Sequence, residues 1–116
     1  MAILTRDAIL AAQDLATQDV AVPEWGGEVR IRVLTGAERD ALSLSLLDKD
    51  GKPDLSTYKV RLVAACVVDE AGVRQFSDSD IAVLGSKSAM ALQRVFDAAD
   101  ALNAMQPGAV ETAEKN

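Results

Sequence analysis

The sequence predicts an α+β fold: an N-terminal short helix and antiparallel β-hairpin, followed by a mainly helical part with a second small hairpin. Apolar and polar residues alternate over residues 20–33, which is typical of two half-buried strands. Thr35 and Glu38 have the spacing of a helix capping box. Apolar residues at 92, 95, 96, 99 and 102 follow the helical period. These three observations predict strands first and helices after them.

Length and composition predict one small folded domain. The chain has 116 residues, of which 49% are hydrophobic and 26% charged, as in ordinary globular proteins. Pro107 and Gly108 end the last helical pattern, so we expect residues 1–106 to form a single domain and residues 107–116 a flexible tail. Aromatic residues make up only 3%, which leaves aliphatic side chains and alanine to fill the core.

Charge and targeting signals exclude several classes of partner and location. The net charge of -6 repels phosphate backbones, so we do not expect a nucleic-acid partner. No apolar run approaches the roughly 20 residues that cross a bilayer. Cys66 is the single cysteine, and Asp7 interrupts any secretory signal. These features predict a cytosolic protein without membrane contact.

The first elements are a short helix and a hairpin. Thr5 is a predicted N-cap for a helix that ends near Gln13. Strands are expected from residue 19 to 22 and from 28 to 33, joined by a turn at residues 23–27 in which Gly26 and Gly27 permit positive φ. Arg30 and Arg32 fall on the polar positions of the second strand, so we expect both to face solvent.

The helix that begins after Thr35 carries more leucines than one helix face can bury. Residues 43–46 alternate like a strand, but the cap and the helical spacing outweigh so short a run. The surplus predicts either self-association or partner binding, or equally a helix packed between two layers of its own domain. The candidate partner-binding residues here are Leu42, Leu44, Leu46 and Leu47.

The remaining elements follow from turn and cap residues. A polar loop at 48–54 ends in Asp54, a predicted cap for a helix that buries Leu55, Tyr58, Leu62, Ala65 and Cys66. Residues 67–76 predict the second hairpin, with glycine in its turn. Ser77 should cap a short helix that a left-handed Gly85 terminates. A longer helix is expected from Ser86, with its polar face at Arg94, Asp97, Asp100 and Asn103.

Groups able to perform catalysis are scarce. The sequence has no histidine, which removes the usual proton-transfer group and the commonest zinc ligand. Cys66 lies in an apolar stretch and is expected in the core. Asp48 and Asp50 resemble the start of a calcium loop that the following residues do not complete. Asp78 and Asp80 are explained as helix-start acids. We therefore expect no enzyme activity, cofactor or metal.

Trp25 is a further candidate partner-binding residue. It lies at the predicted tip of the hairpin, between Glu24 and Gly26. A tryptophan there is either folded back onto the core, which we favour by about six to four, or offered to a partner, since tryptophan is enriched in binding hot spots.

Several segments together resemble one protein family. Residues 22–32 read VPEWGGEVRIR, residues 34–40 read LTGAERD, and residues 68–72 and 76–80 read VDEAG and FSDSD. With RLVA at 61–64, LGSKSA at 84–89 and RVF at 94–96, they are similar in order and interval to the tail assembly chaperones of long-tailed siphophages and their prophages. Nearly the whole chain is covered.

That resemblance implies a chaperone in phage tail morphogenesis, encoded just before the tape measure gene. It would bind the tape measure protein and keep it soluble for tail tube assembly, would act in the host cytoplasm and would be absent from the mature virion. A longer form made by programmed frameshift would recruit the tail tube protein. Glu114-Lys115-Asn116 permits a slippery codon run, or is only a polar tail. The alternative is a structural virion component such as a head-tail connector or tail tube accessory protein.

Overall fold

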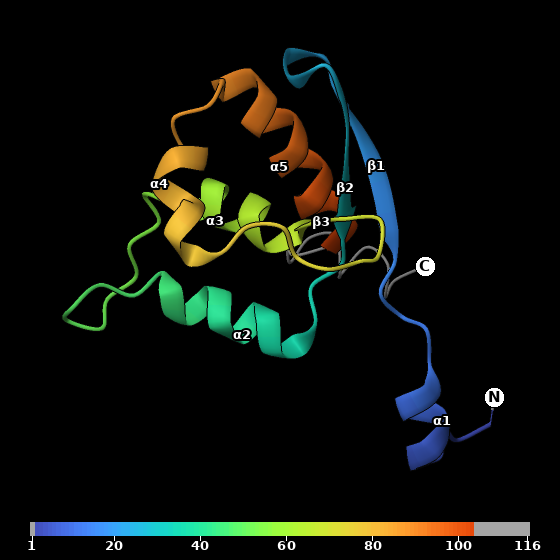
Figure 1. Ribbon diagram of the computed structural model, residues 1–116. Helices are drawn as coiled ribbons and strands as arrows, with labels where there is room; N and C mark the ends of the chain where they lie inside the picture. The colour runs from blue at the N-terminus through green and yellow to red at the C-terminus, as the bar shows by residue number, and fades with distance from the viewer. Residues whose placement is uncertain (1, 104–116) are drawn as a thin grey trace.

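The structure is a computed structural model that describes residues 2–103, and the predicted tail and the Glu-Lys-Asn end lie outside these residues. It begins with helix α1, Arg6–Ala11. Thr5 caps α1 as predicted, because its Oγ1 accepts a hydrogen bond from the N–H of Ala8 at 3.2 Å. The helix ends two residues before the predicted end. None of its side chains is buried, and it stands away from the body of the protein (Figure 1).

A three-stranded antiparallel sheet follows, in the order β1-β2-β3. Strands β1, Thr17–Val22, and β2, Gly27–Arg32, pair along their whole length, with Val20 opposite Val29. The predicted hairpin is therefore confirmed. The 3-10 turn η1, Pro23–Trp25, joins the two strands, and Gly26 closes it at a φ of 76°. The expected positive φ is wrong for Gly27, which is already the first residue of β2.

The second hairpin forms only in part. Strand β3, Val67–Val68, is followed by a turn in which Gly72 has a φ of 84° and Asp69 N–H donates to Val73 O at 2.9 Å. The returning chain makes a single isolated bridge, between Val68 and Arg74. Because β3 also pairs with β2, this segment extends the first sheet, which local sequence patterns did not predict.

Helices α2, Gly36–Ser45, and α3, Tyr58–Cys66, cover the next stretch. The capping box is confirmed: Glu38 N–H donates to Thr35 Oγ1 at 3.0 Å, and Thr35 N–H donates to Glu38 Oε1 at 2.8 Å. The predicted cap at Asp54 is wrong, since its carboxylate accepts from Ser56 N–H in a turn that precedes α3. Leu55 consequently lies outside the helix and is exposed.

The chain ends in a short and a long helix. The 3-10 turn η2, Asp78–Asp80, leads into α4, Ile81–Leu84, and α5 covers Ala89–Asn103. Gly85 was expected in the left-handed region, but its φ is -65°. A Cβ there would lie 3.3 Å from Ile81 O, so the glycine allows a close approach. The long helix begins later than expected, with Ser88 Oγ accepting from Ala91 N–H at 3.3 Å.

The core lies between one face of the sheet and the helices α3 and α5 (Figure 1). Its fully buried side chains come from the sheet and from both helices: Val22, Ile31, Leu62, Val63, Cys66, Val68 and Val95. The expectation that Arg32 faces solvent is wrong. Its guanidinium is half-buried, donating to Gly72 O at 3.2 Å and to Glu38 Oε1 at 2.5 Å. Arg32 thus connects β2 with α2 and with the turn after β3.

Candidate partner-binding surface

Trp25 is held at the hairpin tip by its neighbours. Glu24 Oε1 and Oε2 accept hydrogen bonds from Arg94 Nε at 3.0 and 3.1 Å, which ties η1 to α5. The bond from Arg94, with a smaller contribution from the backbone of η1, lowers the pKa of Glu24. The Trp25 side chain is 37% exposed. It is therefore partly folded onto the protein and partly open to solvent.

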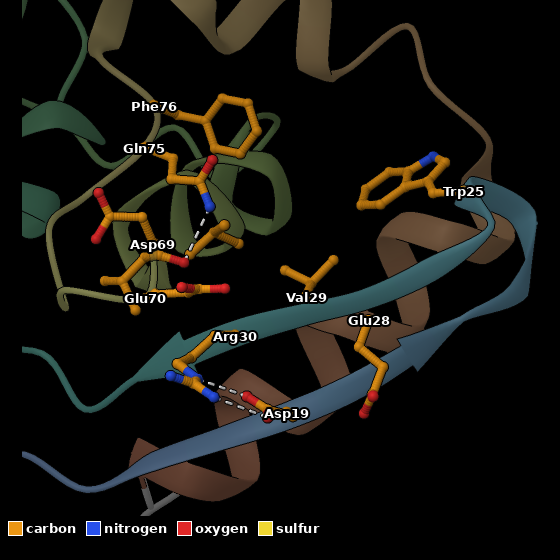
Figure 2. A pocket seen from close by; sticks show the side chains of 11 residues that line it. Asp19, Trp25, Glu28, Val29, Arg30, Asp69, Glu70, Gln75 and Phe76 are labelled. Atoms are coloured by element: carbon orange, nitrogen blue, oxygen red, sulfur yellow. Dashed lines mark hydrogen bonds and ion pairs between the residues drawn. The ribbon is translucent and has the colours of Figure 1, made fainter.

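A groove runs from the hairpin tip across the open edge of β2. Its apolar half, about 500 Å³, lies beside α4, and its polar half, about 390 Å³, lies beside the sheet. Trp25, Gln75 and Phe76 line both halves. Figure 2 shows Trp25 and Phe76 on opposite sides of the space, with Val29 between them on β2. We call the two halves together the Trp25–Phe76 groove.

The groove exists because the third strand is short. β3 pairs with β2 only at Arg30 and Ile31, and the chain then turns away through Asp69–Gly72. The edge of β2 from Gly27 to Val29 consequently has no strand beside it within residues 2–103. The returning chain bonds to β3 and not to this edge: Gln75 N–H donates to Val67 O at 3.1 Å and Gln75 Nε2 donates to Val68 O at 3.0 Å. The groove lies between this segment and the hairpin tip.

Acidic side chains dominate the polar half. Arg30 is the one cation among its lining residues, and it donates from Nε and Nη2 to the two carboxylate oxygens of Asp19 at 2.7 and 3.1 Å (Figure 2). That hydrogen bond lowers the pKa of Asp19. The carboxylates of Glu28 and Glu70 are exposed and make no hydrogen bond or ion pair within residues 2–103, although both attract the Arg30 guanidinium at longer range. The polar half therefore carries two acidic groups that are only partly balanced by Arg30, which is bonded to Asp19.

The four candidate leucines do not form one surface. Leu42 and Leu46 are buried in the core, whereas Leu44, 68% exposed, and Leu47 face solvent. None of the four lines the groove. The structure thus separates Trp25 from the leucines and leaves Leu44 and Leu47 exposed outside the groove. Phe76 and Val83 were not identified as candidates, because nothing local indicates that a loop residue and a four-residue helix come to face Trp25.

The residues considered for catalysis or metal binding have structural roles. Cys66 is buried and free, as predicted. Asp48 Oδ1 accepts from the N–H groups of Asp50 and Lys52 at 2.9 Å each, which closes a turn. Asp80 Oδ2 accepts from Ser77 N–H at 2.9 Å at the start of η2. Within residues 2–103, no group of three or more acidic or cysteine side chains has the arrangement of a metal site.

Fold and groove together define a small α+β protein with an exposed groove lined by apolar and acidic side chains. Among its described helices, none is sufficiently long and apolar to span a bilayer. No protein-family model and no curated protein matches the sequence. Among solved structures, the chain is similar to the tail assembly chaperone of bacteriophage HK97, with a TM-score of 0.56 and 20% identity over 83% of this chain and 94% of that one. The two proteins share a fold.

Proposed function

We propose that this chain is a phage tail assembly chaperone that binds the tape measure protein and keeps it soluble while the tail tube assembles. The shared fold with the HK97 chaperone, which extends over almost all of that protein, carries the proposal. The sequence segments at residues 22–40 and 61–96 support it independently, since they resemble this family in order and spacing.

Its mechanism is reversible burial of apolar surface, with no covalent chemistry. Trp25 and Val83 in the groove, Leu44 on α2 and Leu47 just after that helix are exposed apolar side chains on a chain with a net charge of -6. Such surfaces bind apolar helices, and the excess negative charge keeps the complex soluble. On this proposal the protein acts in the host cytoplasm and is absent from the finished virion.

Co-expression tests the proposal. The tape measure protein encoded beside this gene should stay in the supernatant when this chain is present and should pellet when it is absent. Equal solubility in both cases would contradict a chaperone role. Purified particles distinguish the rival class, because a head-tail connector or tail tube accessory protein would be found in them at fixed stoichiometry.

The longer product is a separate part of the proposal. A ribosomal shift near codons 114–115 would extend the chain with a domain that recruits the tail tube protein. Sequencing the gene and mass spectrometry of the expressed products test this. Codons that cannot slip, or no overlapping frame downstream, would remove the longer form and leave the chaperone role intact.

A further inference from the structure

The apolar half of the groove has the features of a helix-docking site. Trp25 and Phe76 provide two aromatic walls, and α4 provides Val83 and Leu84. Val83 is 63% exposed although it is apolar and lies in a helix. A volume of about 500 Å³ is within the range of natural binding pockets. Aromatic anchors in a recess are where binding energy concentrates in protein interfaces.

The charges around the groove indicate which charges a bound segment should carry. Glu28 and Glu70 line the polar half without a direct ion pair, and the one cation beside them, Arg30, is bonded to Asp19, so this half keeps an excess of negative charge. A basic side chain placed there would gain ion pairs, whereas an acidic one would be repelled. The apolar half ends instead at Lys87 and Asp80. The groove therefore favours a ligand that is apolar along one part and basic at one end.

The open strand edge does not favour an extended ligand. Strand addition gains affinity from a row of main-chain hydrogen bonds, but the longest unpaired stretch on this edge of β2 is Gly27–Val29. In an antiparallel ladder only alternate residues direct their N–H and C=O groups to a given neighbour. So short an edge offers few such bonds, and side-chain burial must supply most of the affinity.

We propose that the Trp25–Phe76 groove binds an amphipathic helix of the tape measure protein, with apolar side chains between the two aromatic rings and a lysine or arginine beside Glu28 and Glu70. This inference rests on the proposed function and adds its site and the character of the bound segment. It also predicts that the groove, and not the exposed Leu44 and Leu47, provides the main contact.

Substitution of exposed residues tests the site without disturbing the fold. Val83→Asp places a charge on the wall of the groove. Leu44→Asp changes α2, and Leu55→Asp is the matched control, since Leu55 is 66% exposed and lies outside the groove. Each variant is co-expressed with the tagged full-length tape measure protein, and the amount of chain that co-purifies is measured. Far-ultraviolet circular dichroism checks that each variant is folded.

We expect Val83→Asp to lower the co-purified amount by roughly tenfold or more, because a carboxylate on this wall would lose its water when an apolar helix docks against it. Leu55→Asp should behave as the wild type. Loss of binding in Leu44→Asp with retention in Val83→Asp would overturn the groove and leave the chaperone function standing. A wild-type chain that neither binds nor solubilises the tape measure protein would overturn both.

The charge requirement has its own test. Combined Glu28→Lys and Glu70→Lys substitutions should weaken binding and reduce its dependence on salt between about 0.1 M and about 1 M, where ion pairs are progressively screened. The combined substitutions Asp14→Lys and Asp50→Lys are the control, since both residues are exposed outside the groove and the net charge changes by the same amount. Equal weakening in the control and the double variant would contradict a basic segment at this end of the groove.

Discussion

The side-chain oxygen of Asn103 accepts a hydrogen bond from the backbone N–H of Leu34 at 2.8 Å, which connects the end of α5 to the chain between β2 and α2. The amide nitrogen of Asn103 donates to Ala99 O at 2.9 Å and lies 3.5 Å from the sulfur of Cys66. Asn103 had been expected on the polar outer face of its helix. It instead satisfies a backbone donor beside the core.

Asn103→Ala should therefore destabilise the protein although asparagine is a poorer helix former than alanine. Leu34 is buried, and removal of its acceptor leaves an unsatisfied N–H that costs about 1–3 kcal/mol. Urea unfolding measures the loss. Asp97→Ala, on the exposed side of the same helix, should change stability little. Equal effects of the two substitutions would contradict the role assigned to Asn103.

Glu38 should make stability depend on pH. Burial alone would raise its pKa, but Thr35 N–H and the Arg32 guanidinium outweigh burial and lower the pKa below the ordinary value of 4.5. A carboxylate whose pKa is lower in the folded than in the unfolded chain stabilises the fold at pH values above the unfolded-state pKa. This stabilisation is lost as the pH falls through the pKa of the folded state.

Glu38→Gln removes that charge and should cost about 1 kcal/mol at pH 7. The difference in unfolding free energy between wild type and variant should shrink as the pH falls below 4.5. Urea titrations at several pH values measure it. A difference that is constant with pH would show that the charge of Glu38 contributes nothing.

Cys66 should be unreactive in the folded protein. Burial raises the pKa of its thiol to about 11, despite the opposing contact with Asn103, so very little thiolate exists at pH 8. A disulfide reagent should label the native chain very slowly and the urea-unfolded chain at the normal rate. Rapid labelling of the native chain would mean that this part of the core opens readily.

Arg94 should control the position of the hairpin tip. Arg94→Ala removes the bonds to Glu24, and Trp25 is the only tryptophan in the chain. Because the ion pair is solvent-exposed, the midpoint of urea unfolding should change little. Acrylamide should quench the tryptophan fluorescence of the variant more strongly than that of the wild type. Unchanged quenching would show that the tip is held by other contacts. Arg6→Ala, far from the tip on α1, is the control.

Local patterns predicted local structure well. The cap at Thr5, the capping box of Thr35 and the β1–β2 hairpin each depend on residues close together in the sequence, and each is confirmed. The predicted cap at Asp54 and the left-handed Gly85 are wrong, because a different turn and a close packing contact replaced the commonest local solutions.

The groove could not be predicted in the same way. It requires β3 to join the first sheet, and Phe76 and Val83 to meet Trp25 across about fifty residues of chain. No sequence period encodes that arrangement. The four leucines at residues 42–47 show the same limit. Their number predicted a surplus, but only tertiary packing decides that Leu42 and Leu46 are buried while Leu44 and Leu47 are exposed.

The central claim is that this chain binds the tape measure protein. Its most direct test is size-exclusion chromatography of the two proteins after co-expression, with both quantified in every fraction. The account predicts one soluble complex that contains both chains, eluting ahead of the free 12.3 kDa protein. Elution of this chain only at its free position, with the tape measure protein in the pellet, would contradict it.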